Sequence, residues 1–206
     1  MIFAILPVKA PQNAKQRLSA VLDAAGRERL ARLLYEHMLE TVCAARGIDR
    51  ILVVTSDPIT AEQARRRDAL VLAETEQVSH SRSADAAAKR AIELGAATVA
   101  LLPIDVPLVT PADIETLLAP PRPALIIVPS ADGSGTNALV RTPPDIIESR
   151  FGPGSFQAHL EQAQSRGIEV EVRRPPGLIF DLDTPEDLMR LRDLGGGPRR
   201  VTEDGG

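Results

Sequence analysis

Thr98-Val-Ala-Leu-Leu-Pro-Ile-Asp-Val-Pro-Leu-Val109 is an apolar run that contains a single carboxylate, Asp105. A strand buried on both faces of a parallel sheet has this continuous apolar form rather than an alternating one. Ligands of open α/β sheets bind just beyond the carboxyl ends of such strands, where Asp105 falls. The run therefore predicts a central strand with an acid at its C-terminal end. An ordinary turn aspartate, bonded to nearby backbone N–H groups, is the alternative.

Strand-like and helix-like segments alternate on both sides of this run. Apolar spacing, caps and breakers predict helices over residues 26–46, 61–67, 83–94, 111–118, 156–166 and 185–194. Strands are predicted over residues 2–8, 50–55, 69–73, 98–102, 124–129, 136–140 and 168–173. Such alternation indicates right-handed βαβ units, and the hairpin-like pair after residue 124 adds one antiparallel strand. We expect an α/β fold with helices on both faces of a mostly parallel sheet.

Length and composition set limits on the function. The 206 residues, 44% of them hydrophobic, suffice for one domain over residues 1–194, and we expect the Gly-rich, charged tail 195–206 to be disordered. A net charge of −4 provides no basic field for nucleic acid or an anionic membrane. No apolar stretch approaches the ~20 residues that span a bilayer. The lone cysteine, Cys43, is expected to pack in the core. We expect a soluble, cytoplasmic protein that binds neither nucleic acid nor membrane.

The loop from Lys9 to Leu18 carries three cations and no glycine. Only three of the 24 basic residues are lysines, and two of them, Lys9 and Lys15, lie here together with Arg17. Lysine ammonium groups bind phosphates as point charges. The loop is therefore predicted to hold a triphosphate by charge, and a solvated basic loop is the alternative.

A second polar segment places Asp181 and Asp183 at positions i and i+2. On an extended chain these carboxylates point the same way, and with Asp105 they offer the hard oxygen ligands that Mg²⁺ prefers. The sequence Thr184-Pro-Glu-Asp187 is also a helix start, which Asp183 could merely support. Capping does not explain Asp181, so we favour a metal site.

Small residues are concentrated in two further segments, Gly133-Ser-Gly-Thr-Asn137 and Arg150-Phe-Gly-Pro-Gly-Ser155. Glycines let backbone N–H groups approach a ligand closely, and Thr136 and Ser155 add hydroxyl donors suited to a phosphate or carboxylate. Each segment alone is also typical of an ordinary turn. His159, one helical turn after Ser155, is expected to face the same pocket.

Six motifs in this order resemble a known family, the 2-phospholactate and phosphoenolpyruvate guanylyltransferases of deazaflavin coenzyme F-420 biosynthesis. They are Pro7-Val-Lys9, Ala14-Lys-Gln-Arg-Leu18, Pro103-Ile-Asp-Val-Pro107, Gly133-Ser-Gly-Thr136, Arg150-Phe-Gly-Pro-Gly-Ser155 and Asp181-Leu-Asp-Thr-Pro-Glu-Asp-Leu188. The resemblance implies the three-layer αβα nucleotidyltransferase fold shared with molybdenum-cofactor guanylyltransferases. It also implies roles for individual residues: Asp105, Asp181 and Asp183 as ligands of Mg²⁺, Thr136, Gly152 and Ser155 as acid-binding residues, and Lys9, Lys15 and Arg17 as the catalytic cations on the GTP phosphates.

The resemblance further implies the reaction, transfer of GMP from GTP to a small phosphorylated three-carbon acid with release of pyrophosphate. Phosphoenolpyruvate, 2-phospho-L-lactate and 3-phospho-D-glycerate stay open as acceptors, a symmetric homodimer stays open, and the product would pass to the next enzyme of the pathway. Asp85 stands where family members commonly have Asn, and as a nucleotide-binding residue it could accept hydrogen bonds from guanine. The alternatives are a nucleotidyltransferase for a sugar phosphate or pterin and a non-catalytic nucleotide-binding subunit.

Overall fold

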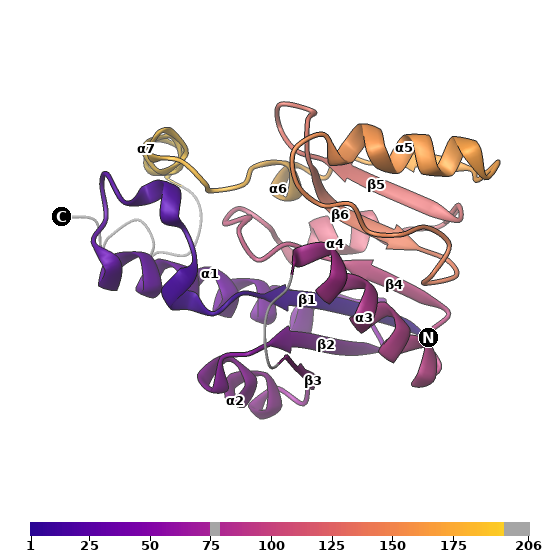
Figure 1. The fold of residues 1–206 in the computed structure, drawn as a ribbon, viewed down its shortest axis with the longest axis horizontal. Coiled ribbons are helices and arrows are strands. Elements are labelled where there is room, and N and C mark those ends of the chain that lie inside the picture. Colours follow the sequence, from indigo (N-terminus) through magenta and orange to yellow (C-terminus); the bar gives the residue numbers. More distant parts are fainter. Residues whose placement is uncertain (75–78, 196–206) are drawn as a thin grey trace.

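A seven-stranded sheet forms the centre of the computed structural model, which describes residues 1–74 and 79–195 (Figure 1). The strand order across the described residues is β3-β2-β1-β4-β6-β5-β7. The strands are β1 (Ile2–Val8), β2 (Arg50–Thr55), β3 (Leu70–Ala73), β4 (Thr98–Leu101), β5 (Leu125–Pro129), β6 (Thr136–Arg141) and β7 (Val170–Val172). β6 pairs antiparallel with β4 and β5, and the other pairs are parallel. The predicted sheet, mostly parallel with one antiparallel strand, is confirmed.

Helices cover both faces of the sheet (Figure 1). One face packs against α1 (Ala24–Ala44), α2 (Pro58–Arg66), α4 (Pro111–Leu117) and α6 (Pro176–Ile179). The other face packs against α3 (His80–Glu93) and α5 (Ser155–Ser165). β4 contributes to both cores, because Ala100 points to the first and Val99 and Leu101 to the second. Burial on both faces is the reason that its sequence is a continuous apolar run.

A third, smaller core lies outside the sheet and joins the two ends of the described chain. It contains Leu18, Leu34, Leu182 and Leu188 among its buried members. These residues come from the short 3-10 turn η2 (Gln16–Leu18), from α1, and from α7 (Pro185–Leu194) with the segment before it. A second 3-10 turn, η1 (Pro11–Asn13), precedes η2 in the same loop. The cationic loop is therefore packed against the last helix.

Three helices begin two or three residues earlier than predicted, because their capping residues were not recognised. Asp23 accepts a hydrogen bond from the backbone N–H of Gly26 and so caps α1. Asp57 caps α2 and Ser79 caps α3 by bonding the backbone N–H three residues ahead in the same way. Such side chains replace the missing partners of the first helical N–H groups.

Other differences lie at the ends of elements. α6 was not predicted, and the strand expected over residues 168–173 is shortened to Val170–Val172. Cys43 was expected in the core but is exposed: each residue turns by ~100° around a helix, and the neighbouring Val42 faces the sheet. The tail predicted to be disordered lies outside the described residues, except for Gly195, which caps α7 with a φ of 58°. The single domain over residues 1–194 stays a prediction. None of the described helices is long and apolar enough to cross a membrane.

Candidate active site

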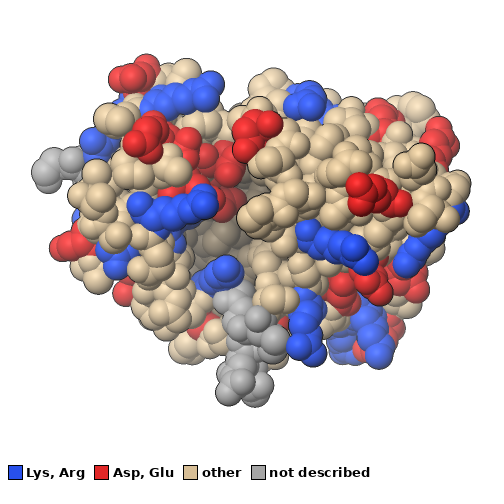
Figure 2. All heavy atoms as spheres, turned by 45° about the horizontal axis from the view of Figure 1, so that its top comes forward, with Lys and Arg blue, Asp and Glu red and all other residues tan. Residues whose placement is uncertain are grey.

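The loops after β1 and β4 meet the beginning of β6 at one edge of the sheet. Because β6 runs antiparallel to β4, with Leu139 beside Leu101, its first residues lie next to the carboxyl end of β4. Thr136 and Asn137 therefore join the loop of Asp105 at this edge. Figure 2 shows a hollow in the middle of the molecular surface, with Asp and Glu side chains gathered beside it. Open α/β sheets bind their ligands at the edge formed by the carboxyl ends of their parallel strands, here β1 and β4.

Lys15 connects two of the three predicted metal ligands. Its ammonium nitrogen lies 3.0 Å from Asp105 Oδ2 and 2.9 Å from Asp183 Oδ1. The side chain is buried, whereas that of Arg17 is 74% exposed and reaches Asp183 only at 4.0 Å. Lys15 has a φ of 53°, in the left-handed region that is uncommon for residues other than glycine. Strained backbone of this kind concentrates at functional sites.

The acidic segment is held in place by backbone bonds and by the cap of α7. The N–H of Leu182 donates to the carbonyl oxygen of Asp105 at 2.9 Å, so the two acidic segments run side by side. Thr184 and Asp187 form a capping box, in which Asp187 also accepts from the backbone N–H of Asp183. Since Asp187 caps the helix, the carboxylate of Asp183 is available to Lys15. The helix cap is thus made by Asp187 and not by Asp183, and the role of Asp183 as a metal ligand stays a prediction.

Charges in this cluster depend on one another. Burial would lower the pKa of Lys15, but Asp105 and Asp183 outweigh this effect, and the pKa is raised. Burial would likewise raise the pKa of Asp105, and Lys15 lowers it below its ordinary value. For Asp181, burial and the charge of Asp105 act together to raise the pKa. At neutral pH the ammonium of Lys15 thus stays charged and the carboxylate of Asp105 stays ionised.

The donor set suits a divalent cation, but the described side chains are not arranged around one. No group of three or more His, Cys, Asp or Glu side chains in residues 1–74 and 79–195 is placed to hold a metal ion. The ammonium of Lys15 instead lies where Asp105 and Asp183 converge. Those hard oxygen donors, with Asp181 close enough for its pKa to respond to both, fit a divalent cation if the ammonium moves away.

The predicted acid-binding residues surround the start of α5. Gly152 has a φ of 124° and Gly154, the N-cap, a φ of 73°, so the loop needs glycine at both positions. Ser155 is 1% exposed, and its Oγ has no hydrogen-bond partner among residues 1–74 and 79–195. A buried hydroxyl without a partner is costly unless a ligand supplies one. Together with the positive end of the helix, this arrangement suits an anion.

The structure gives His159 and Arg141 hydrogen bonds that the sequence did not predict. The Nδ1 of His159 lies 3.0 Å from Thr136 Oγ1, and its Nε2 accepts from the backbone N–H of Arg150 at 2.9 Å. Arg141 is 1% exposed and bonds Asp85 at 2.9 Å through Nη1. The sequence does contain a signal for this buried pair, because Arg141 directly follows the apolar residues 138–140 of a predicted strand.

Asp85 lies on α3 and is bonded within the chain. Besides Arg141, its carboxylate accepts from the hydroxyl of Ser149 at 2.7 Å and from the backbone N–H of Ser149 at 3.1 Å. Its predicted contact with guanine stays a prediction. Lys9 is exposed at the end of β1. The pKa of His80 is lowered by burial; Asp105 opposes this effect, and the charge of Lys9 adds to it.

Asn137 and α6 hold the chain just before the acidic segment. The side-chain amide of Asn137 donates to the carbonyl oxygens of Leu178 at 2.9 Å and Ile179 at 3.0 Å. The backbone N–H of Gly177 donates to Asp113 Oδ1 at 3.1 Å. These bonds hold the turn that leads from α6 directly to Asp181.

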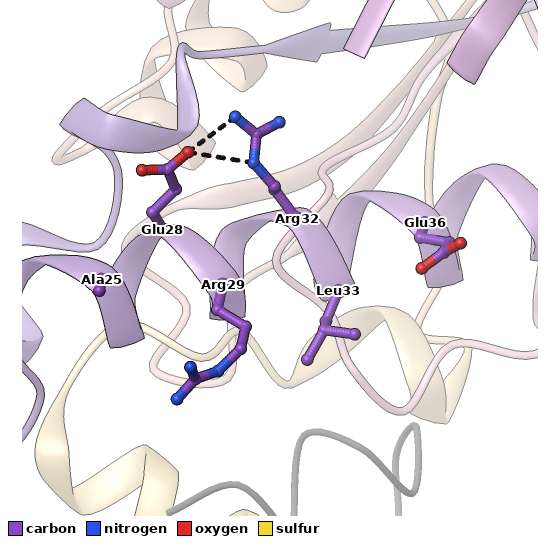
Figure 3. Close-up of a pocket in the computed structure, with 6 residues that line it drawn as sticks. All are labelled: Ala25, Glu28, Arg29, Arg32, Leu33 and Glu36. Carbon is purple, nitrogen blue, oxygen red and sulfur yellow. Dashed lines mark hydrogen bonds and ion pairs between the residues drawn. The ribbon is translucent and has the colours of Figure 1, made fainter. Parts of the chain in front are cut away.

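A separate pocket of about 300 Å³ lies along α1. Figure 3 shows that one helix supplies all the lining residues: Ala25, Glu28, Arg29, Arg32, Leu33 and Glu36. Arg32 already pairs with Glu28 at 2.7 Å and with Asp57 at 3.2 Å. No predicted site residue lines this pocket, so it is not the candidate active site.

Comparisons with known proteins identify the family of this chain. The family model described as "Guanylyl transferase CofC like" matches residues 2–199. A phosphoenolpyruvate guanylyltransferase from Rubrobacter xylanophilus is 44% identical over 97% of this chain and 99% of its own. A 2-phospho-L-lactate guanylyltransferase from Methanothermobacter thermautotrophicus is 34% identical, over 91% of this chain and 82% of its own. A 3-phospho-D-glycerate guanylyltransferase from Colwellia psychrerythraea is 32% identical, over 91% of this chain and 89% of its own.

Solved structures show the same fold. A nucleotidyl transferase from Methanothermobacter superposes with a TM-score of 0.67 at 20% identity, and the match covers 94% of this chain and 97% of that one. At this identity the likeness concerns the fold alone. The predicted nucleotidyltransferase fold is confirmed.

Proposed function

Because this chain belongs to the family of CofC-like guanylyl transferases, we propose that it transfers GMP from GTP to phosphoenolpyruvate and releases pyrophosphate. The enzyme class, a nucleotidyltransferase, follows from the family. The choice of phosphoenolpyruvate is supported by the name of the Rubrobacter relative, which is more similar to this chain than the relatives named for 2-phospho-L-lactate or 3-phospho-D-glycerate. The proposal places the reaction in the biosynthesis of the deazaflavin coenzyme F-420.

One observation supports the proposal most strongly: the hydroxyl of Ser155, at the start of α5, is buried and has no hydrogen-bond partner in the described part of the chain. It lies at the sheet edge that also carries the Lys15 cluster, so an anion bound there has a second, charged site nearby. A transfer between two anionic substrates requires such a pair of sites, because their mutual repulsion must be overcome. A protein that only bound a nucleotide would not need the second site.

In the proposed reaction a phosphate oxygen of the acid attacks the α-phosphorus of GTP in line. A new P–O bond forms as the bond to the pyrophosphate leaving group breaks. The attacking phosphate is already ionised, so no general base is required. Lys9, Lys15 and Arg17 contact the triphosphate, and the raised pKa of Lys15 keeps its ammonium charged at neutral pH. Thr136, Gly152 and Ser155 bind the acid.

We propose Asp105, Asp181 and Asp183 as the residues that hold Mg²⁺. When bound, the cation supplies charge neutralisation at the phosphates. The support is the donor chemistry and the convergence of Asp105 and Asp183 on one point 2.9 to 3.0 Å away, now filled by the ammonium of Lys15. Lys15 must therefore leave these carboxylates before the site can be loaded, and this movement would bring it to the triphosphate.

The remaining parts of the proposal concern the cellular setting. GTP and phosphorylated three-carbon acids are cytoplasmic metabolites, so we place the enzyme in the cytoplasm. The product contains a diphosphate linkage in which GMP is a good leaving group, so the next enzyme must be one that displaces GMP. Assembly as a symmetric homodimer stays a prediction.

The direct test is pyrophosphate release from GTP and Mg²⁺ with each of the three acids in turn, with ATP and CTP as nucleotide controls. We expect release with GTP and phosphoenolpyruvate, and mass spectrometry of the product should show the acid joined to GMP. If none of the three acids supports release, a sugar phosphate and a pterin are tested in their place, and release with either would replace the proposed acceptor. Tight GTP binding without release from any acceptor would support the non-catalytic nucleotide-binding subunit.

A further inference from the structure

His159 contacts every segment of the proposed acid-binding pocket. It lies on α5 one turn after Ser155, it is 0% exposed, and its ring reaches β6 through Thr136. On its other side it accepts from the backbone N–H of Arg150, which opens the loop that contains Gly152. One imidazole therefore joins the three segments that supply the acid-binding residues.

The two hydrogen bonds determine which ring nitrogen carries the proton. The N–H of Arg150 can only donate, so Nε2 must accept and is unprotonated. A neutral imidazole has one proton, which then resides on Nδ1 and is donated to Thr136 Oγ1, 3.0 Å away. The oxygen of Thr136 is thus occupied as an acceptor, and the hydroxyl proton is left to donate elsewhere.

The surroundings of the ring maintain this neutral form. Burial, and then the positive charge of Arg141, lower the pKa of His159 to about 4. Asp85, which would oppose this effect, is paired with Arg141 at 2.9 Å. Phe151 packs edge-on against the ring with the centroids 5.6 Å apart, so the orientation of the ring is fixed as well.

We propose that His159 is a positioning residue for the acceptor acid, because it forces the hydroxyl of Thr136 to act as a hydrogen-bond donor toward the anion and fixes the loop of Gly152 beside it. The inference rests on the proposed function, in which Thr136, Gly152 and Ser155 bind the acid. His159 does not contact the substrate itself. It is buried behind Thr136, and the reaction requires no base.

The proton position can be tested in the unaltered protein. Long-range ¹H–¹⁵N NMR spectra of the imidazole at pH 7 should show His159 with a protonated Nδ1 and an unprotonated Nε2. The opposite tautomer or a doubly protonated ring would overturn the inference. This measurement requires neither turnover nor a variant.

Two variants separate the two hydrogen bonds. His159→Asn keeps an amide N–H at about the place of Nδ1 and so keeps the donor to Thr136. His159→Gln places its carbonyl near Nε2, which keeps the acceptor for Arg150 but loses that donor. We expect His159→Gln to raise the KM for the acid by about 10-fold, the cost of ~1.4 kcal/mol for a lost hydrogen bond, with the KM for GTP unchanged. His159→Asn should raise it by less.

A double-mutant cycle tests whether His159 acts through Thr136. Thr136→Val removes the hydroxyl and keeps the shape of the side chain, and we expect it to raise the KM for the acid by about 10-fold or more. Adding His159→Gln to Thr136→Val should then have no further effect on this KM. Independent, additive effects would overturn the role of His159. An unchanged KM in Thr136→Val alone would instead refute the placement of the acid, which belongs to the proposed function.

Discussion

Lys15 has two partners that are mutually repulsive without it. Its ammonium lies between Asp105 and Asp183, whose side chains are 31% and 38% exposed. Removing the ammonium leaves two carboxylates converging on an empty point. Because both are partly exposed to water, the repulsion is weaker than in a dry core. Lys15 is therefore expected to affect the stability of the protein when Mg²⁺ is absent and its catalysis when Mg²⁺ is bound.

We predict that Lys15→Met lowers the free energy of unfolding by about 1 to 2 kcal/mol in EDTA. The loss is smaller than for a fully buried ion pair, because Asp105 and Asp183 are partly hydrated. Mg²⁺ should restore more stability to this variant than to the unaltered protein, because the cation no longer competes with the ammonium. Urea unfolding with EDTA and with Mg²⁺ measures both effects. Lys89→Met, at an exposed position of α3, is the matched control. An identical response to Mg²⁺ in Lys15→Met and the unaltered protein would contradict the metal site.

Asp85 offers a test between a structural and a nucleotide-binding role. Its carboxylate pairs with Arg141, which is 1% exposed, so Asp85→Asn removes the hydrogen-bonded counter-charge of a buried guanidinium and leaves only the weaker effect of Asp145. We predict a loss of about 2 kcal/mol in unfolding free energy, below the ~3 to 5 kcal/mol of a fully buried pair because Asp85 is partly exposed. The preference for GTP over ATP should be unchanged. A stable Asp85→Asn protein with altered base preference would instead support the predicted guanine contact.

At the scale of elements, α6 shows how a four-residue helix can position a site. It connects the sheet to the acidic segment, and the packing around Gly177 leaves no room for a side chain. A Cβ at this position would lie 2.5 Å from Asp113 Oδ2, 2.6 Å from the carbonyl oxygen of Leu108 and 2.7 Å from the Cα of Val109. Two of these atoms belong to backbone, which cannot move independently.

Gly177→Ala should therefore destabilise the protein by about 2 to 3 kcal/mol, in the range of overpacked cores. It should also lower kcat, because α6 leads directly to Asp181. Thermal unfolding and steady-state kinetics measure the two effects. Gly47→Ala is a useful control, since its φ of 91° is unfavourable for alanine but no atom of the described residues lies within 4 Å of the new Cβ. Equal losses in the two variants would show that steric contact at Gly177 is unimportant.

Elements with a strong local signal were predictable and contacts between them were not. The apolar run of β4 and the cap and proline at Thr110 and Pro111 are local, and the structure has both features. α6 was missed because the sequence Pro176-Gly-Leu-Ile179 has the composition of a turn. Lys15 is 90 residues from Asp105 and 168 from Asp183, so no local pattern indicates that it bridges them. The sequence did predict that Lys15, Asp105 and Asp183 lie at one site. Each of them follows or ends a strand-like segment, and each lies in a motif that resembles the family.

For the whole molecule, buried ionisable groups make stability depend on pH. The pKa of His159 is lowered to about 4 in the folded protein, against ~6.5 for an unperturbed imidazole. Between these values the unfolded chain binds more protons than the folded one. The free energy of unfolding therefore falls as the pH falls from ~6.5 toward 4, and His159 accounts for up to roughly 3 kcal/mol of this change.

We predict that the unaltered protein loses about 2 kcal/mol more stability than His159→Asn between pH 6.5 and 5, because asparagine does not titrate. Urea unfolding at both pH values gives the difference, and comparison with the variant removes the contributions of His37, His80 and the carboxylates. Parallel pH dependences would mean that His159 is protonated in the folded protein or is not buried as described.

The third core has a consequence for the order in which the protein becomes functional during its synthesis. Leu18, near the start of the chain, is completely buried against residues that include Leu182 and Leu191. The ribosome makes the cationic loop and its partners in α1 among the first segments, and the remaining partners, from Phe180 to Leu191, about 160 or more residues later. A nascent chain can pair β1 with β2 well before that stage, but the third core then still lacks Phe180, Leu182, Leu188 and Leu191. Competence to bind the nucleotide should therefore arise abruptly, when α7 leaves the exit tunnel.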